Sequence, residues 1–294
     1  MPEFNTKNPE TREYLLNIVE HWIKEADIDG WRLDAVEYLE PSFVVDIRRR
    51  AKKVKEDVYI VGEVVGTATS WFKAEALDGV MNYKLWDLIV DFFAKGKHDA
   101  RWFNSALYFL RRSYPRWANY SNFNLLGSHD RPRFLTICEN DVRKLKLALV
   151  FLMTYIGAPS IYYGDEIGME GENDPDCRRT FIWDEKRQNK EILDFFKFVI
   201  KLRKEQTTLR RGSFNPFYFE GGIYGYLRKL EGQSIIVVLN NSEREENITI
   251  DMDLAGFKPS KVMDLVRGDL IDPNGSTIDV KIPEYGFILL LLQS

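Results

Sequence analysis

Cysteine is scarce in this chain of 294 residues, which contains only Cys138 and Cys177. A single pair in a chain of this length indicates reduced thiols in a cytoplasmic setting rather than a disulfide framework. The two cysteines also lack the paired spacing of a zinc site. We therefore expect no metal site, and no motif requires a cofactor.

Long apolar segments and an excess of basic charge are missing as well. The apolar run at residues 287–292 is far too short to cross a bilayer, and Met1-Pro-Glu3 lacks the charged and apolar regions of a signal peptide. The formal net charge is −4, which gives no electrostatic reason to expect nucleic acid or an anionic membrane as partner. We expect a cytoplasmic protein, and its charge is compatible with a neutral substrate.

The first two thirds of the chain alternate between helix and strand patterns, which predicts an α/β fold. Asn8 is placed to cap a helix over residues 9–26, with Pro9 in its first turn. Strands at 30–34 and 58–63 enclose a helix at 41–55, a βαβ unit typical of a parallel sheet. Further helices are predicted near 84–95, 99–112, 140–156 and 190–205, and further strands at 77–81 and 160–163.

Beyond residue 211 the pattern changes to short strands rich in Val and Ile, separated by Gly, Asn, Asp and Pro turns. The predicted strands are 223–230, 234–240, 247–252, 261–266, 277–282 and 287–292. Such spacing predicts an antiparallel β-sandwich. We therefore divide the chain into an α/β domain at 1–211 and a sandwich domain at 212–294.

Acidic residues stand at the ends of three predicted strands. Arg32 and Asp34 end the first, Glu63 ends the second, and the segment from Asn122 leads to His129-Asp130. In a (β/α) barrel the catalytic side chains lie at the carboxyl ends of the strands, so these acids are expected to converge. Hydrolysis of a glycosidic bond requires two flanking carboxyl groups, which makes a glycosidase the leading hypothesis.

These motifs carry a resemblance to a known family. The order G-x-R-x-D, G-E and H-D resembles the α-amylase family of glycoside hydrolases, and Met1-Pro-Glu-Phe-Asn5 is similar to the M-P-K-L-N motif of its neopullulanase, cyclomaltodextrinase and maltogenic amylase branch. Further matching segments are Met81-Asn-Tyr83, Pro159-Ser-Ile-Tyr-Tyr-Gly-Asp-Glu166 and Asp174-Pro-Asp-Cys-Arg-Arg179. The resemblance runs over essentially the whole chain and implies a (β/α)8 TIM barrel.

By this resemblance Asp34 is the nucleophile that forms a β-glycosyl-enzyme, and Glu63 protonates the leaving oxygen and then activates water. Arg32 lies on the same strand face and would keep Asp34 ionised, while a less polar setting would favour a proton on Glu63. The implied activity is retaining hydrolysis or transglycosylation of α-glucosidic bonds in maltooligosaccharides, cyclodextrins or pullulan. A surface ion pair is the competing interpretation of Arg32 and Asp34.

The resemblance also assigns the third acid and its neighbours. Asp130 would hydrogen-bond sugar hydroxyls more strongly in the distorted transition state, and His129 would bind the same ring. Arg178 resembles a residue that contacts substrate, and the resemblance places Arg32 among the substrate-binding residues as well. The competing interpretations are a turn or capping pair for His129-Asp130 and a solvated loop for Arg178 and Arg179.

Some positions depart from the pattern of the branch. Asp34-Ala-Val-Glu-Tyr38 stands where the branch reads D-V-A-N-E. In the branch a His often follows the motif G-E-I-W, and this chain has Val65 and Gly66 there instead. Arg131 replaces a residue that is usually small. These positions lie at the edge of the expected sugar-binding cleft. The departures therefore affect the expected preference for linkage and acceptor, and they leave the assignment of the three acids unchanged.

The motif of the family's third-strand loop falls at the start of this chain, so strands one to three have no counterpart in it. We expect the carboxyl-terminal part of a barrel, about five eighths of one, from the third helix to the eighth. Its open edge would lead to homo-oligomers or to a complementing chain that supplies the missing strands. The alternative function is a truncated, catalytically silent paralogue that serves as a carbohydrate-binding or assembly module.

Overall fold

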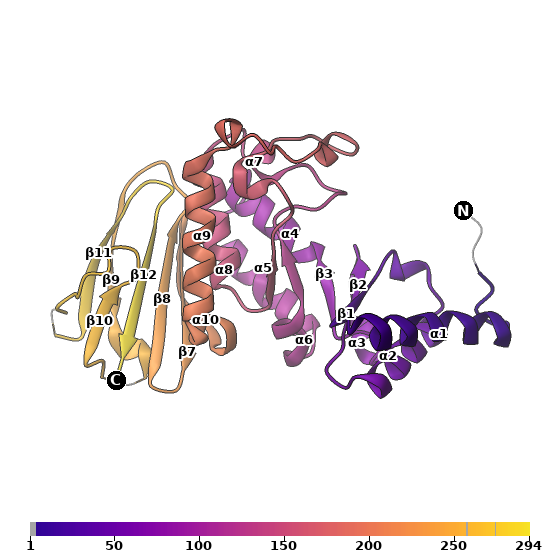
Figure 1. Cartoon of the computed structure of the whole chain (residues 1–294). Coiled ribbons are helices and arrows are strands. Elements are labelled where there is room, and N and C mark those ends of the chain that lie inside the picture. Colours follow the sequence, from indigo (N-terminus) through magenta and orange to yellow (C-terminus); the bar gives the residue numbers. More distant parts are fainter. Residues whose placement is uncertain (1–3, 257, 274) are drawn as a thin grey trace. The chain divides into compact units, whose positions relative to one another are not determined.

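The computed structural model describes residues 4–256, 258–273 and 275–294 (Figure 1). The first three residues of the Met1–Asn5 motif therefore lie outside the described residues. The chain divides into two compact units, the first formed by Met1–Lys84 and Leu110–Asn124 and the second by Leu85–Phe109 and Leu125–Ser294.

The first unit begins with the predicted helix α1 (Pro9–Ala26), whose first turn is capped because the Asn8 side chain accepts the N–H of Thr11 at 3.0 Å. Its elements after α1 are β1 (Gly30–Leu33), η1 (Val36–Tyr38), α2 (Pro41–Val54), β2 (Tyr59–Val64), α3 (Thr69–Lys73), β3 (Gly79–Asn82) and α6 (Arg116–Ser121). The helix α4 (Tyr83–Ile89), the helix α5 (Ala100–Ser113) and the strand β4 (Phe123–Leu125) cross the boundaries between the units.

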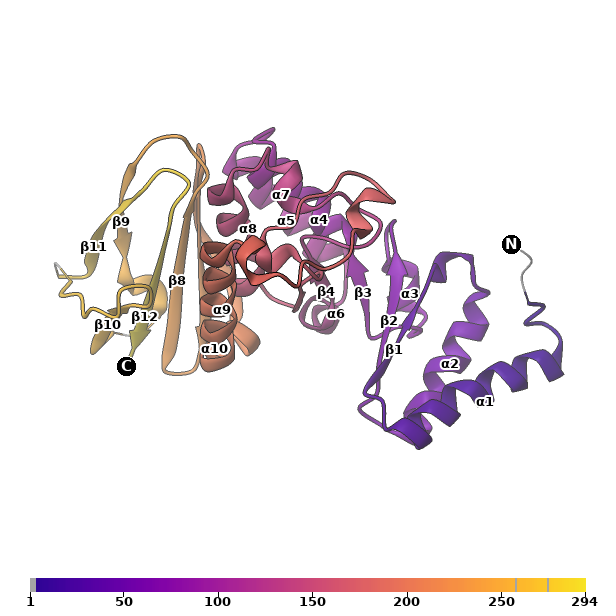
Figure 2. The ribbon, with the colours of Figure 1, turned by 45° about the horizontal axis from the view of Figure 1, so that its top comes forward.

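Strands β1, β2, β3 and β4 follow one another in a parallel sheet, as the βαβ pattern predicts. Ile60 and Val64 of β2 pack in one core with residues of α1 and α2. These two helices lie on one side of β1 and β2 (Figure 2). Because side chains alternate along a strand, Glu63 points to the opposite face of the sheet from these helices. Among the described strands, β1 pairs only with β2, so its outer edge carries unpaired backbone groups.

The second unit contains helices followed by antiparallel strands. Its helical part consists of η2 (Val90–Ala94), α7 (Phe134–Ile137), α8 (Val142–Thr154), β5 (Ala158–Ser160), η3 (Asp165–Ile167), η4 (Asp176–Arg178), η5 (Glu185–Arg187), α9 (Lys190–Glu205) and α10 (Thr207–Arg211). The strands that follow are β6 (Ser213–Glu220), β7 (Ile223–Leu230), β8 (Gln233–Asn240), β9 (Glu246–Asp251), β10 (Lys261–Asp264), β11 (Thr277–Ile282) and β12 (Phe287–Gln293), with η6 (Met252–Ala255) after β9.

These strands form two sheets, one in the order β10-β12-β8-β7-β6 and one that pairs β11 with β9. Apolar side chains from both sheets, among them Ile236, Val238, Ile250 and Ile278, share one core. The predicted antiparallel sandwich is therefore confirmed. The switch from helices to strands falls at Gly212, but the compact units divide elsewhere, so the domain boundary near residue 211 stays a prediction.

β6 was not predicted from the sequence, and β5 lies earlier in the chain than predicted. β6 contains Pro216, which cannot donate a backbone hydrogen bond, and it is tolerated because β6 is an edge strand with a register shift between Pro216 and Tyr218. The strand predicted at 160–163 instead ends at Ser160. The rings of Tyr162 and Tyr163 flank the Arg133 guanidinium, with the carbon Cζ at 4.2 and 4.7 Å from their centroids.

Candidate active site

One arginine binds both acids of the first unit. The Arg32 Nη1 atom lies 2.5 Å from Asp34 Oδ1, and its Nη2 atom lies 3.1 Å from Glu63 Oε2. The parallel register places Arg32 opposite Val61, two residues before Glu63 on the same face of β2. Arg32 was assigned from the sequence as the partner of Asp34, and its guanidinium also contacts Glu63.

The shared guanidinium limits how far apart the two acids lie. Its two terminal nitrogens belong to one rigid planar group, so Asp34 Oδ1 and Glu63 Oε2 lie within roughly 8 Å of each other. That bound is below the roughly 9 Å at which a retaining assignment would be rejected. The predicted carboxyl separation of about 5–5.5 Å stays a prediction.

The two carboxylates differ in exposure. The Asp34 side chain is 74% exposed, whereas that of Glu63 is 12% exposed. Glu63 is thus the less solvated acid, but its Oε2 atom also accepts the N–H of Ala35 at 2.9 Å. Ala35 has φ of 44°, a left-handed conformation that turns the backbone after Asp34 toward β2. Both contacts, with Arg32 and with Ala35, are made by the Oε2 atom of Glu63.

Two further features of the first unit escaped the sequence analysis. Met81 was noted only as part of a motif, yet the Arg32 Nε donates to its sulfur at 3.2 Å and so orients the guanidinium. A cavity of about 860 Å³ lies beside Asp34, and the exposed rings of Phe4 and Tyr38 help to line it. Tyr38 occupies the last position of the segment that departs from D-V-A-N-E, which ties this departure to the cavity next to the proposed nucleophile.

The remaining predicted site residues meet in the second unit. Asp130 Oδ1 lies 3.0 Å from Arg178 Nη2, and Asp130 Oδ2 lies 3.1 Å from His129 Nε2. Arg178 also donates through Nε to the carbonyl of His129 at 3.0 Å and binds Asp174 at 2.7 Å. Arg178 thus belongs with the His129-Asp130 pair, and Asp174 is a partner that the sequence analysis did not identify.

The structure therefore assembles the predicted residues as two groups. Arg32, Asp34 and Glu63 meet at the tips of β1 and β2 in the first unit, and His129, Asp130 and Arg178 meet in the loops of the second. The convergence of all three acids on one cleft stays a prediction. Among the residues that the structure describes, no cluster of three or more His, Cys, Asp or Glu side chains is placed to hold a metal ion.

A buried ion pair supports the loops that carry Asp130 and Arg178. The Arg133 side chain is fully buried; it donates to Asp165 Oδ1 at 2.8 Å and to the carbonyl of Tyr163. Burial raises the pKa of Asp165 to about 6, although Arg133 opposes the shift. Asp165 lies in the Tyr163–Glu166 segment that the sequence analysis interpreted as structural, and these contacts agree with that interpretation.

This shift predicts a pH dependence of stability. The folded-state pKa of Asp165, about 6, is above its unfolded value of about 3.9, so its contribution to stability is fully present below pH ~4 and is lost as the pH rises through ~6. In the wild type this titration should make the free energy of unfolding fall as the pH rises from ~4 to ~6. The Asp165→Asn variant should lack that fall, and urea denaturation at each pH measures the difference.

Asp141→Asn is the matched control for Asp165→Asn. Hydrogen bonding from Arg143 lowers the pKa of Asp141, so its contribution is present above the unfolded pKa and is lost as the pH falls. The difference between wild type and Asp141→Asn should grow with pH, opposite in sign to that for Asp165→Asn. Equal slopes for the two variants would contradict the assignment of a raised pKa to Asp165.

The parallel sheet with acids at its strand tips agrees with what comparison with known proteins finds. Residues 1–186 match the family described as "Alpha amylase, catalytic domain", and residues 220–289 match "Maltogenic Amylase, C-terminal domain". The chain belongs to the alpha-amylase family.

Its relatives carry the names that the resemblance predicted. The chain is 41% identical to a cyclomaltodextrinase of Geobacillus thermopakistaniensis over 100% of its own length and 50% of the relative's. It is 37% identical to neopullulanase 2 of Thermoactinomyces vulgaris over 99% and 49%. A solved structure titled cyclomaltodextrinase superimposes with a TM-score of 0.92 at 35% identity, covering 100% of this chain and 50% of that one. The chain thus spans about half the length of these relatives.

Proposed function

We propose that this chain is the carboxyl-terminal part of an enzyme that hydrolyses or transfers α-glucosidic bonds with retention of configuration. The observation that carries the proposal is the Arg32 guanidinium, which holds Asp34 and Glu63 together at adjacent strand tips. The names of the relatives support α-glucan oligosaccharides as the substrate class, including cyclodextrins and pullulan.

In this mechanism the exposed Asp34 attacks the anomeric carbon, and the ion pair with Arg32 keeps it charged. Glu63, whose Oε2 accepts the N–H of Ala35 and pairs with Arg32, protonates the leaving oxygen through Oε1 and later removes a proton from water. Asp130, with His129 and Arg178 beside it, binds sugar hydroxyls in the transition state.

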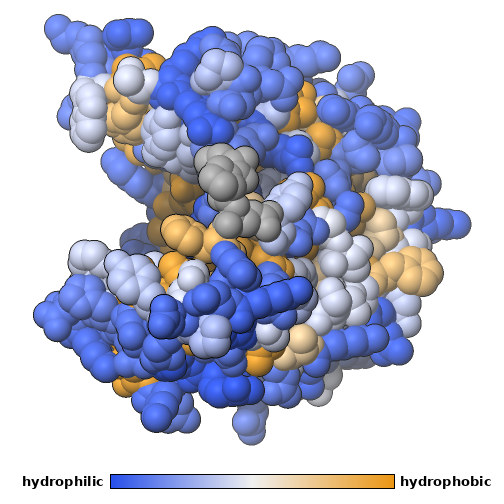
Figure 3. Space-filling view, turned by 90° about the vertical axis from the view of Figure 1, so that its right-hand side faces the viewer, coloured by the Kyte–Doolittle hydropathy of each residue, from blue (hydrophilic) through white to orange (hydrophobic). Residues whose placement is uncertain are grey.

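We propose further that another polypeptide segment or a second chain completes the barrel. β1 pairs on one edge only among the described strands, and Tyr14, Ile18 and Trp22 expose one apolar face of α1 at four-residue spacing. Figure 3, which views the molecule from the side of α1, shows hydrophobic side chains exposed among hydrophilic ones. An added strand on β1 and a helix against α1 would cover these groups.

A cytoplasmic location is part of the proposal. One relative, 36% identical over 85% of this chain, is an intracellular maltogenic amylase of Bacillus subtilis. Of the helices described, none combines the length and apolar character that a membrane crossing requires.

The test is complementation. The chain alone should show little hydrolysis of maltotriose or cyclodextrin. Mixing or co-expressing it with the part of the Geobacillus cyclomaltodextrinase that it does not match should produce a complex of higher mass with hydrolytic activity. Proton NMR of the first product should show the α-anomer, as retention requires.

Two results would contradict this function. A complex that forms but releases the β-anomer would reject the retaining mechanism. A complex that binds cyclodextrin without hydrolysing it would favour the alternative, a catalytically silent carbohydrate-binding module. The molecular mass of the chain alone should be measured by light scattering on the same fractions that are assayed for activity. A monomer with full activity would show that no complementing segment is needed.

A further inference from the structure

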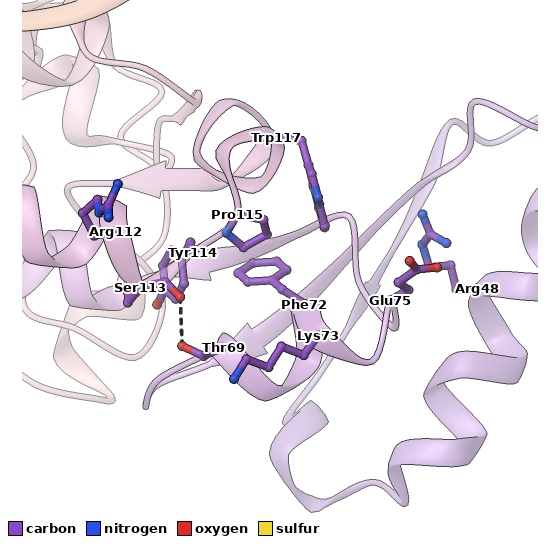
Figure 4. Close-up of a pocket in the computed structure, with 10 residues that line it drawn as sticks. All are labelled: Arg48, Thr69, Phe72, Lys73, Glu75, Arg112, Ser113, Tyr114, Pro115 and Trp117. Carbon is purple, nitrogen blue, oxygen red and sulfur yellow. Dashed lines mark hydrogen bonds between the residues drawn. The ribbon is translucent and has the colours of Figure 1, made fainter.

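A second cavity lies away from the acids. It has a volume of about 540 Å³, within the range of small-molecule sites. All its lining residues belong to the first unit. They come from α2, from α3 and Glu75 shortly after it, and from the stretch between the end of α5 and the start of α6 (Figure 4). None of them lies at the tip of β1 or β2, so this cavity is separate from the site of Asp34 and Glu63.

An aromatic platform forms one wall of this cavity. Trp117 is 46% exposed, and its ring meets the edge of the buried Phe72 ring with 5.5 Å between centroids. Phe72 in turn packs against the buried Tyr114 at 5.1 Å. Thr69 donates to the carbonyl of Ser113 at 3.1 Å and so ties α3 to the segment that carries Trp117 (Figure 4). Trp117 is therefore held on a rigid base with part of its ring open to a ligand.

The charged groups of the cavity do not suit a compact anion. Arg48 is already bound to Asp78 at 2.9 Å, and Glu75 lies beside it at the opposite end of the cavity from Arg112 in Figure 4. Lys73, Arg112 and Glu75 form no ion pair with any described residue, so their donors and acceptor remain for a ligand. The cavity thus offers separated donors on Lys73 and Arg112, a carboxylate acceptor on Glu75 and an aromatic face. This combination suits a neutral sugar chain, because a sugar ring can stack on the aromatic face while its hydroxyls donate and accept hydrogen bonds.

We propose that this cavity is a second binding site for α-glucan chains, with Trp117 as the stacking platform. The identity of the sugar rests on the proposed function, because the same substrate is the carbohydrate that this protein would encounter. The site would hold a long glucan on the protein without taking part in bond cleavage.

The test is native gel electrophoresis of the full chain with and without soluble starch in the gel. Starch should retard the wild type, and Trp117→Ala should weaken the apparent affinity by roughly tenfold, the loss expected for a stacking ring. Trp102→Ala removes another partly exposed tryptophan, on α5 outside the cavity, and should behave like the wild type. The double variant Asp34→Asn/Asp130→Asn should remain retarded, because the cavity does not use these acids.

Retardation needs no catalysis, so this test and the complementation test fail independently. Absence of retardation in the wild type, equal retardation of Trp117→Ala, or its loss in the double variant would each overturn the proposal. NMR of the Trp117 indole gives a second measurement that does not depend on affinity for starch. Maltoheptaose should shift its resonance, and a shift with inorganic phosphate instead would identify an anion site and reject the glucan assignment.

Discussion

Asp34→Asn is expected to abolish turnover by the complemented barrel, with a loss of roughly ten-thousand-fold or more in kcat. The amide cannot attack the anomeric carbon, and it also replaces the charged partner of Arg32, whose Nη1 lies 2.5 Å from Asp34 Oδ1. Arg32 still binds Glu63, so the strand tips should keep their arrangement. The measurement is steady-state hydrolysis of maltotriose and of an activated aryl maltoside, with circular dichroism to establish that the variant folds.

Glu63→Gln is the matched comparison because it changes the other acid on the same guanidinium. Its loss should be large for maltotriose, whose leaving group needs a proton. The loss should be much smaller in the glycosylation step for the aryl maltoside, whose leaving group does not. Equal losses on both substrates would contradict the role of Glu63, and an Asp34→Asn enzyme with substantial activity would contradict the nucleophile assignment.

Arg203→Ala is expected to lower the free energy of unfolding by about 4 kcal/mol. Arg203 is buried on α9, where Nη1 donates to the carbonyls of Met153 and Tyr155 at 2.7 and 3.1 Å, and Nη2 donates to that of Gly157 at 2.5 Å. The carbonyls of Met153 and Tyr155 lie at the end of α8, where a cation also stabilises the helix dipole, and Gly157 follows shortly after it. Alanine would leave these carbonyls buried without a donor.

The environment of Arg203 supports this estimate. Burial and the nearby Arg228 lower the pKa of Arg203 to about 10, so the charge is costly to bury but is retained at neutral pH. Lys204→Ala removes the neighbouring exposed cation on the same helix and should change stability by less than about 0.5 kcal/mol. Urea denaturation measures both variants. A loss below about 1 kcal/mol for Arg203→Ala would show that water replaces the guanidinium at the carbonyls.

Local patterns were enough for many of the elements. Helices at 9–26 and 190–205 and strands at 223–230 and 277–282 were predicted with the bounds that the structure gives. Their caps, periodicity and turn residues lie within or next to the element, so no distant contact is needed to define them. β6 was missed because Pro216 opposes a strand locally, and only its position at the sheet edge makes it tolerable.

The sequence by itself determined the family, the order of the strand-tip acids and the change from an α/β pattern to antiparallel strands, because each depends on residues close together in the chain. Only the tertiary structure decided that one Arg32 guanidinium serves both Asp34 and Glu63, and that Ala35 donates to Glu63. It also decided that Arg178 binds Asp130, 48 positions earlier in the chain. Such contacts follow from strand register and loop packing, which bring distant residues together and leave no local signal in the sequence.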